Sequence, residues 1–566
     1  MQGAEKIRKR LIHIYGQEKG NQACKRIYPI LESFPAKAKV KKEYFSEKDI
    51  VLITYGDSLQ SADASPLETL CLFAVKQLKN RFSAIHILPF YPYSSDDGFS
   101  VIDFFTVNPE LGTWEEIQQI GDHFELMFDF VVNHISSKSE WFSRYLAEEK
   151  GFEDLAIEAD PSMDLSGVTR PRSLPLLTEY RKRSGEPVWV WTTFSADQID
   201  LNFNSMNVLE KMVKVLLHYI DNGARMIRMD AIAYLWKQIG TSCIHLPTTH
   251  EMVKLFRDIF DLTAPDVINL TETNVPHDEN ISYFGNGKDE AQMVYNFTLP
   301  PLLFYTFVKG NTSILSGWAK KLVLVSSDNT FFNFTASHDG IGVRPLEGIL
   351  PKGEIDDLID IVKKNGGQVS CRQNADGSES PYELNITYVD AMWHNMGKPD
   401  PYHAERFLAS QSIMLCLPGV PAIYIHSLLG SRNWEEGFRK TGRARTINRE
   451  KLNIQDVFTA LDDDGSFRSR VFFPYMSLIA IRRSQPAFHP NALFEVLDIH
   501  EKVFVLKRSG KGQTIFSITN VTEYPVRLAW MDDDQQVMKD LLNGQVMHAE
   551  EILLAPYQYR WLVPKQ

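Results

Sequence analysis

Residues 51–57 read VLITYGD, a continuous apolar run that ends in a turn-prone Gly-Asp pair. Such a run is typical of a strand that is buried on both faces of a parallel sheet. Similar runs recur at 84–90, 125–134, 226–231, 267–273, 293–297, 331–339 and 421–425. Stretches of helical period separate most of them, and VLEKMVKVLLHYIDNG at 208–223 is the clearest. Eight strands with helical crossovers predict an α/β fold, the (β/α)8 or TIM barrel.

The rest of the sequence predicts how this barrel is extended. Residues 1–48 are charged and helix-like, and they predict a helical extension before a catalytic barrel at 49–492. The segment at about 135–205 is rich in Pro, Thr and aromatic residues and predicts an inserted small domain. A second long gap, at about 340–420, predicts an active-site loop region. The alternating, turn-rich residues 493–566 predict a C-terminal antiparallel β domain.

Composition excludes several classes of protein. The 566 residues are 44% hydrophobic and 23% charged, which is ordinary for a globular chain. A formal net charge of −12 disfavours a nucleic-acid partner, and it means that an anionic ligand needs a locally cationic pocket. No window is apolar enough to span a membrane, and the N-terminus lacks the apolar core of a signal peptide. We therefore expect a cytoplasmic protein with no membrane partner.

The five cysteines are scattered, odd in number and never in a C-x-x-C spacing. This pattern fits neither a disulfide framework nor a zinc site, so we expect free thiols in a reducing compartment. The sequence also contains no EF-hand pattern and no obvious calcium cage. We therefore expect no metal and no cofactor.

Four acidic residues lie inside or at the end of the strand-like runs, namely Asp129, Asp230, Glu272 and Asp339. An acid is costly in a protein core, whereas the mouth of a barrel is a polar cleft. A single Asp at a strand end is most often a cap or turn residue. Four acids on different strands, with His134, Arg228 and His338 beside them, instead predict an active site, because barrel catalytic residues come from several strand ends.

The strings DFVVNH, RMDA, NLTET and ASHDG resemble, in order and spacing, the four motifs of the α-amylase family, glycoside hydrolase family 13. The resemblance extends from about residue 50 to the C-terminus. It implies that Asp230 is the nucleophile, Glu272 the acid/base, and Asp339 the third acid, which holds the 2- and 3-hydroxyls of the sugar. It also implies that Arg228 orients Asp230.

The chemistry of acetal cleavage explains why these residue types are needed. The leaving group requires a proton, so Glu272 must be protonated at the working pH. A carboxylate on the opposite face, Asp230, traps the sugar carbon as a covalent intermediate, and two such steps retain the anomeric configuration. Arg228 should keep Asp230 ionised, while Asp339 and Asp230 should raise the pKa of Glu272.

Further strings resemble the sucrose phosphorylase subfamily, namely SSDDGFSVIDF at 94–104, TRPR at 169–172, TFSADQIDLN at 193–202, RMDAIAYLWKQIGTSC at 228–243 and TINR at 446–449. The resemblance implies that Asp96 and Arg445 bracket the glucosyl 4-hydroxyl. The other residues that it implies for glucosyl binding are Phe99, His134, Phe194, Gln198, Arg228, Tyr234 and His338. It further implies that Arg172 helps to bind phosphate, although an ordinary ion pair is the alternative for this residue.

The strings SHDGIGVRP at 337–345 and SPYELN at 380–385, within the insert at 374–385, look most like the glucosylglycerate phosphorylase branch. That resemblance implies transfer of an α-glucosyl group from a small glucoside, with glucosylglycerate favoured, to inorganic phosphate, giving α-glucose 1-phosphate. Glycerate is anionic, so its pocket should carry an extra cation. Arg344 is the first candidate for phosphate or acceptor binding, and Lys352 and Arg372 are weaker ones.

Three alternatives stay open from the sequence. The donor can instead be sucrose, sucrose 6′-phosphate or glucosylglycerol. The same acids also suit an α-glucosidase or transglucosidase with water or a sugar as acceptor, which phosphate-dependent release of glucose 1-phosphate would distinguish. A non-catalytic binding protein is disfavoured by the intact acids Asp230, Glu272 and Asp339. The sequence does not indicate an oligomeric state.

Overall fold

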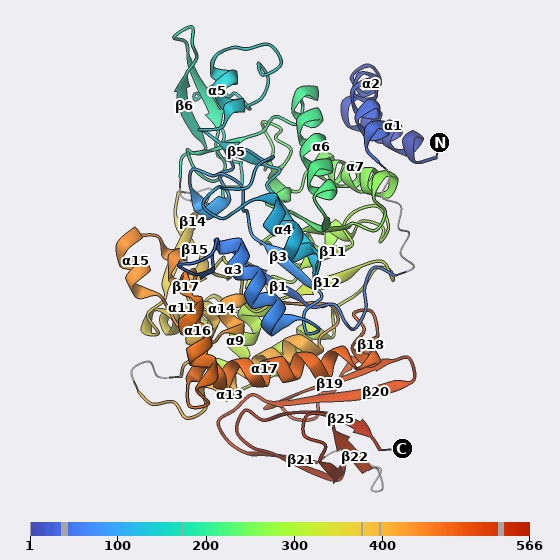
Figure 1. Cartoon of the computed structure of the whole chain (residues 1–566), viewed down its shortest axis with the longest axis vertical. Coiled ribbons are helices and arrows are strands. Elements are labelled where there is room, and N and C mark those ends of the chain that lie inside the picture. Colours follow the sequence, from blue (N-terminus) through green and yellow to red (C-terminus); the bar gives the residue numbers. More distant parts are fainter. Residues whose placement is uncertain are drawn as a thin grey trace.

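The centre of the molecule is a closed barrel of parallel strands (Figure 1). The structure is a computed structural model, and it describes residues 2–35, 43–172, 174–374, 377–394, 398–529 and 537–565. In spatial order the strands are β1 (Val51–Thr54), β3 (Ala84–Ile87), β4 (Glu125–Phe130), β9 (Ala224–Met229), β10 (Ile268–Thr271), β11 (Met293–Tyr295), β12 (Thr330–Asn333) and β16 (Val420–Tyr424). Each overlaps one of the eight predicted runs, so the (β/α)8 barrel is confirmed.

Helices pack around this barrel and alternate with its strands along the chain. They are α3 (Pro66–Phe73), α4 (Trp114–Gly121), α6 (Met206–Asp221), α7 (Pro247–Thr263), α8 (His277–Ile281), α9 (Leu299–Lys309), α10 (Ser313–Ala319), α13 (His403–Cys416), α16 (Ile454–Asp462) and α17 (Phe467–Arg483). Helix α6 lies where the sequence predicts a helix. Its first N–H groups are capped by the Ser205 side chain, and Gly223, at φ 96°, follows its end.

The loops that follow the barrel strands carry small elements of their own. After β4 come β5 (His134–Ser136), α5 (Glu140–Leu146), β6 (Leu177–Arg181), β7 (Pro187–Trp191) and β8 (Gln198–Asp200). After β12 come β13 (Ile341–Gly342), α11 (Lys352–Lys364), β14 (Gln368–Gln373), β15 (Glu379–Asn385) and α12 (Tyr388–Ala391). Strands β13, β15 and β14 form an antiparallel sheet, and residues 375 and 376 of the insert at 374–385 lie outside the described residues.

Two short helices and a strand pair complete the loop system. They are α14 (Ile425–Leu428) and α15 (Glu435–Thr441), both after β16, and β2 (Leu59–Gln60) with β17 (Leu452–Asn453). All of these loops leave the barrel at the carboxyl ends of its strands. In barrel enzymes the active site lies on that face.

Two helices precede the barrel, α1 (Gln2–Tyr15) and α2 (Gln17–Ser33). They pack beside α7 and α6 (Figure 1). Arg10 on α1 donates to Glu251 (Nη1···Oε2 2.7 Å) and to the fully buried Asp258 (Nε···Oδ2 3.2 Å), both on α7. The Tyr15 hydroxyl donates to the carbonyl of Phe203 at 2.8 Å. The N-terminal helices are therefore joined to the outer layer of the barrel.

The C-terminal region is antiparallel throughout, as predicted. Its six-stranded sheet has the order β18 (Leu493–Val496), β19 (Val503–Gly510), β20 (Gln513–Asn520), β25 (Tyr559–Pro564), β22 (Val537–Asp540) and β23 (Val546–His548). A separate pair is β21 (Val526–Ala529) with β24 (Glu551–Leu554). An apolar cluster that includes Val505, Ile518 and Leu554 fills this region. The division at residues 48 and 492 stays a proposal.

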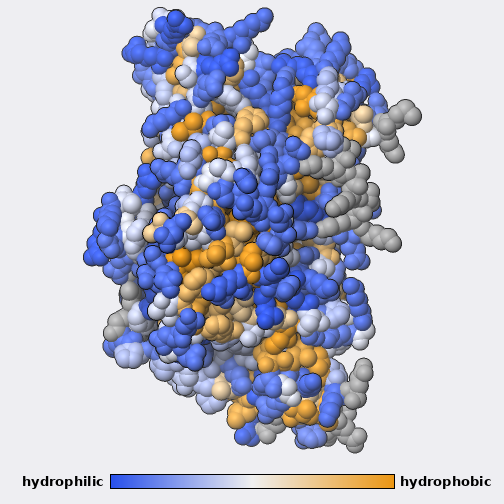
Figure 2. Space-filling view, in the orientation of Figure 1, coloured by the Kyte–Doolittle hydropathy of each residue, from blue (hydrophilic) through white to orange (hydrophobic). Residues whose placement is uncertain are grey.

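The visible face of the molecule is mostly hydrophilic, with smaller apolar patches (Figure 2). Within the described residues, no helix is long and apolar enough to cross a membrane. All five cysteines are free thiols.

Candidate active site

Three of the four acids predicted from the strand ends lie on, or directly after, neighbouring strands of the barrel; the fourth, Asp339, lies in the loop after β12, because that strand ends at Asn333. Asp129 is on β4, and its register partner on β9 is Arg228. Asp230 directly follows β9, and Glu272 directly follows β10. Because β4, β9 and β10 are adjacent and parallel, their carboxyl ends bring these side chains to one point. The sequence places the acids on strands, and barrel closure brings them together.

Arg228 is the common partner of the acids and is almost fully buried. Its Nη1 contacts Asp129 and lies 2.7 Å from Oδ1 of Asp230, while its Nη2 lies 3.8 Å from Oε1 of Glu272. Asp129 is also bonded to His86 (Oδ2···Nε2 2.7 Å). The backbone N–H of Ala231, which has a left-handed φ of 50°, donates to Oε2 of Glu272 at 3.1 Å. Both catalytic candidates are therefore oriented by donors that are themselves held in place.

Burial raises the pKa of Asp230 and of Glu272, and the charge of Arg228 opposes this rise. Repulsion adds to the effect, because the charge of Glu272 raises the pKa of Asp230, and that of Asp339 raises the pKa of Glu272. Two such coupled carboxyls hold one shared proton more tightly than isolated carboxyls do. The closer Arg228 contact favours the ionised form of Asp230, which leaves the proton on Glu272. This is the protonation state that retaining chemistry needs.

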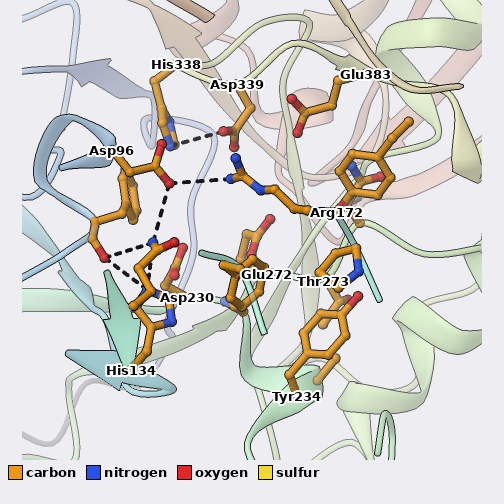
Figure 3. Close-up of a pocket in the computed structure, with 18 of the residues that line it drawn as sticks. Asp96, His134, Arg172, Asp230, Tyr234, Glu272, Thr273, His338, Asp339 and Glu383 are labelled. Carbon is orange, nitrogen blue, oxygen red and sulfur yellow. Dashed lines mark hydrogen bonds and ion pairs between the residues drawn. The ribbon is translucent and has the colours of Figure 1, made fainter. Parts of the chain in front are cut away.

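These side chains line a pocket of about 690 Å³ at the barrel mouth. The predicted site residues that line it are Asp96, Phe99, His134, Arg172, Phe194, Gln198, Arg228, Asp230, Tyr234, Glu272, His338, Asp339 and Arg445. Figure 3 shows Asp96, His338 and Asp339 grouped at one end, Tyr234 and Thr273 at the other, and Glu272 between them.

A dense polar network forms the end of the pocket near Asp96. The side-chain amide of Gln198 lies 3.4 Å from Oδ2 of Asp96, 3.2 Å from Nε2 of His134 and 3.3 Å from the carbonyl of Phe99. The ring of Phe99 stacks on His338 with centroids 4.8 Å apart. Burial lowers the pKa of His134 and lowers that of His338 to about 3, so both imidazoles are neutral. Neutral histidines and an amide suit hydrogen bonding to sugar hydroxyls.

Arg445 closes this end of the pocket from the opposite side. Its Nη1 lies 2.9 Å from Oδ1 of Asp339, and its Nε donates to Oε2 of Glu383 at 3.0 Å. Burial raises the pKa of Asp339, but the charges of Arg445 and Arg449 outweigh it and hold that pKa well below its ordinary value. Asp339 is therefore a carboxylate at any working pH.

The loop that carries Asp96 has an unusual backbone. Asp96, Asp97 and Gly98 have φ values of 53°, 49° and 111°. A side chain at Gly98 would meet the carbonyl oxygen of Pro89 at 2.6 Å, so only glycine fits there. Arg449, which is 4% exposed, holds the loop by donating to Oδ2 of Asp97 (Nη1···Oδ2 2.5 Å) and to the carbonyl of His338 (Nε···O 2.8 Å).

Several residues of the site were missed from the sequence. Those that line the pocket are Pro171, Ala231, Ala233, Thr273, Asn274, Val275, Tyr382 and Glu383, and those that support it are His86, Asp97 and Arg449. The motifs SPYELN, TINR and SSDDGFSVIDF contain Glu383, Arg449 and Asp97, so the signal was present in quoted strings. Nothing in one chain's letters indicates that Glu383 reaches Arg445 across the pocket.

Arg344 is the predicted site residue that does not line this pocket. It begins a short 3₁₀ turn after β13, and its charge acts on Tyr234, Tyr382 and His245. Gly342, on β13, lets this strand approach Asn274 closely, because a Cβ at position 342 would lie 2.6 Å from Oδ1 of Asn274. Arg344 therefore stands next to the pocket wall, where its charge reaches the two tyrosines.

The residues that the structure describes contain no group of three or more His, Cys, Asp and Glu side chains able to hold a metal ion. The expectation of a site without metal or cofactor stays a prediction.

The sequence of this chain is similar to a known protein family and to known proteins. The α-amylase catalytic-domain model matches residues 75–339. The glucosylglycerate phosphorylase of Escherichia coli is 46% identical over 92% of this chain and 93% of the relative, and that of Spirochaeta thermophila is 45% identical over 100% and 99%. The chain belongs to the sucrose phosphorylase-like group of the α-amylase family. The resemblance seen in the four motifs is thereby confirmed.

The α-amylase family fold is also found in solved structures. The crystal structure of sucrose 6F-phosphate phosphorylase from Thermoanaerobacter thermosaccharolyticum matches with a TM-score of 0.75 and 24% identity, over 92% of this chain and 100% of that one. At that identity the likeness concerns the fold, including the barrel and its added sheets.

Proposed function

We propose that this protein is a retaining glucosylglycerate phosphorylase, which transfers an α-glucosyl group from glucosylglycerate to inorganic phosphate. The observation that carries the proposal is the 44–46% identity to three glucosylglycerate phosphorylases over nearly the whole chain. The contacts of Asp230 and Glu272 with a single buried arginine support it, because this arrangement suits double displacement.

In the first proposed step, Asp230 attacks the anomeric carbon while the proton on Glu272 passes to the glycosidic oxygen. Glycerate leaves, and the glucosyl group becomes an ester of Asp230. Arg228 orients Asp230 in this step, at 2.7 Å. Asp339, His134 and His338 bind the ring hydroxyls, and Asp96 and Arg445 close the pocket around the 4-hydroxyl, as the family resemblance implies.

In the second step, phosphate attacks the same carbon and displaces Asp230, and Glu272, now ionised, accepts the phosphate proton. Arg172 is the proposed phosphate ligand. Arg228 and Arg445 already contact carboxylates at short range, whereas Arg172 has only a 3.4 Å contact with Asp96 and a third of its side chain is exposed. Of the cations that line the pocket, Arg172 is therefore the most available to an anion.

The function is tested by incubating the protein with phosphate and each of glucosylglycerate, sucrose, sucrose 6′-phosphate and glucosylglycerol. We expect α-glucose 1-phosphate chiefly from glucosylglycerate, detected by NMR soon after mixing. The β anomer would overturn double displacement. Free glucose formed at the same rate without phosphate would identify a hydrolase instead.

We further propose that Arg344 supplies positive charge to the glycerate side of the pocket. Arg344→Ala should lower transfer from glucosyl fluoride to glycerate by roughly tenfold, and transfer to neutral glycerol much less. Arg439→Ala is the matched control, since Arg439 is exposed on α15 and does not line the pocket. An equal loss with both acceptors would mean that Arg344 only supports its loop.

A further inference from the structure

A second hollow, of about 920 Å³, adjoins the active-site pocket. The two hollows share lining residues, so an ion bound in the second hollow contacts side chains that also face the active-site pocket; the shared residues are Asp96, Pro171, Arg172, Gln198, Tyr382, Glu383 and Arg445. We name this hollow the vestibule. The residues that only the vestibule contains include Ser195, Ser370, Cys371 and Arg443.

Four arginines but three acidic side chains line the vestibule, namely Asp96, Asp97 and Glu383. Of its four arginines, Arg445 is paired with Glu383 and Asp339, and Arg449 is paired with Asp97. Arg172 has the 3.4 Å contact with Asp96. Arg443 is exposed and makes no ion pair or side-chain hydrogen bond with any residue that the structure describes.

The chemistry of the reaction explains why unpaired positive charge here is significant. If the proposed function holds, both substrates and both products are anions, namely glucosylglycerate, phosphate, glucose 1-phosphate and glycerate. The chain has a net charge of −12, and the pocket contains five acidic side chains, those of Asp96, Asp230, Glu272, Asp339 and Glu383, of which Glu272 holds the shared proton. An anion that approaches such a site is repelled unless a cationic region lies on its route.

We propose that Arg443, with Arg172, forms an anion-binding entry site in the vestibule that captures phosphate before it attacks the glucosyl intermediate. Arg443 follows α15 and lies two residues before Arg445, so the same short segment presents one guanidinium to the vestibule and another to the pocket. Arg443 is thus a specificity residue for anionic partners. It takes no part in bond making.

The kinetic test compares Arg443→Gln with Arg439→Gln. Arg439 lies on α15, is exposed and does not line the vestibule, so both variants lose one positive charge and differ only in where they lose it. We expect Arg443→Gln to raise KM for phosphate by about two- to fivefold at low ionic strength, because one exposed charge contributes modestly. The difference should vanish at high salt, where the charge is screened.

Arg439→Gln should leave KM for phosphate unchanged. The rate of glucosyl transfer from glucosyl fluoride to neutral glycerol should be the same in Arg443→Gln as in the wild type. The proposal is overturned if Arg443→Gln has the wild-type KM and salt dependence, or if Arg439→Gln raises KM by the same factor.

A second measurement needs no turnover and therefore separates this proposal from the proposed function. Cys371 is the exposed cysteine and lines the vestibule. In a Cys71→Ser background, its labelling rate is measured with dithiobis(nitrobenzoate), which is a dianion, and with neutral dithiodipyridine. The ratio of the two rates cancels changes in thiolate fraction and reports the local potential.

We expect the ratio of anionic to neutral labelling to fall about two- to fivefold in Arg443→Gln and to stay constant in Arg439→Gln. Inorganic phosphate should slow the anionic reagent in the wild type. An unchanged ratio in Arg443→Gln would refute the entry site even if the enzyme proves to be a phosphorylase. A changed ratio in a protein that forms no glucose 1-phosphate would refute the proposed function and leave the anion site standing.

Discussion

Arg228 holds the carboxylates of Asp129, Asp230 and Glu272 around one buried guanidinium. Burial alone raises the pKa of both catalytic acids, so without this arginine neither would ionise readily. The unequal distances, 2.7 Å to Asp230 and 3.8 Å to Glu272, make the two acids different. In the proposed mechanism, this one residue accounts for which acid attacks and which acid donates.

Substitution of each acid should separate these roles. Asp230→Asn should abolish turnover of every donor while the protein stays folded, because no other group forms the glucosyl ester.

Glu272→Gln should block cleavage of glucosylglycerate but still release fluoride in a burst from glucosyl fluoride, whose leaving group needs no proton. In the wild type, the glucosylglycerate rate should fall as pH rises through the raised pKa of the coupled pair, because the proton is lost. Equal loss of both donors in Glu272→Gln would show that Glu272 has no acid role.

Asp97 shows how a residue without substrate contact affects the site. It holds a left-handed φ of 49° next to Asp96 and accepts from Arg449 (Oδ2···Nη1 2.5 Å). Asp97→Asn keeps a residue that tolerates this conformation but removes the charge. We expect roughly tenfold weaker competitive inhibition by glucose, since Asp96 and Arg449 lose their common anchor, with a melting temperature close to that of the wild type. If inhibition by glucose is unchanged, the backbone around Gly98 is sufficient to hold Asp96 in place without the ion pair between Asp97 and Arg449.

Among the elements, the N-terminal helix α1 is attached to α7 through buried charge. Arg10 and Lys6 both reach Asp258, whose side chain is fully buried, with Lys6 Nζ at 2.6 Å from Oδ1. A buried carboxylate that loses a partner costs free energy that a surface ion pair does not.

Arg10→Leu should therefore lower the free energy of unfolding by about 1–3 kcal/mol, measured by urea denaturation. Lys9→Leu is the control, because Lys9 is exposed on the same helix and makes no ion pair with a described residue. A loss of the same size in both variants would mean that helix composition, and not the contact with Asp258, sets the effect.

For the whole molecule, the buried Arg508 joins the C-terminal sheet to the barrel, and the buried Arg482 joins α17 to the same end of α13. Arg508 on β19 donates to the carbonyls of Cys416 (Nη1···O 2.7 Å) and His489 (Nη2···O 2.6 Å), and Arg482 on α17 donates to the carbonyl of Leu415 (Nε···O 2.8 Å). Burial lowers the pKa of Arg482 to about 10 and that of Arg508 to about 9. These cations cap the last carbonyls of α13, where the helix dipole is negative.

Arg508→Ala should lower the free energy of unfolding by about 2–5 kcal/mol, because it opens a cavity and leaves two buried carbonyls without donors. Arg508→Lys keeps the charge but loses the fork that reaches both carbonyls, so it should lie between Ala and wild type. Melting temperatures of the three proteins are the measurement. A wild-type melting temperature for Arg508→Ala would show that apolar packing alone holds the sheet.

The barrel and its central acids could be predicted from the sequence because both depend on the local pattern of residues. A strand buried on two faces must be apolar along its length, and an acid at its end is conspicuous for that reason. Asp230, Glu272 and Asp339 therefore stood out one at a time, and their order matched a known set of motifs. Arg344 was predicted to supply a cation for the acceptor because it follows Asp339 closely along the chain; it lies in a short turn beside the pocket lining, and its role stays a prediction.

Contacts between loops could not be read in the same way. Glu383 meets Arg445, and Asp97 meets Arg449, across gaps of 62 and 352 residues. In the sequence, an acid or arginine that pairs within the site looks the same as one that is exposed to solvent. Its partner depends on how loops from different strands fold over the mouth of the barrel. The chain's own pattern of apolar and acidic residues determined the barrel and predicted the chemistry that we propose for it. Closure of the barrel decided which loops face each other, because side-chain contacts depend on distance in space and not along the chain.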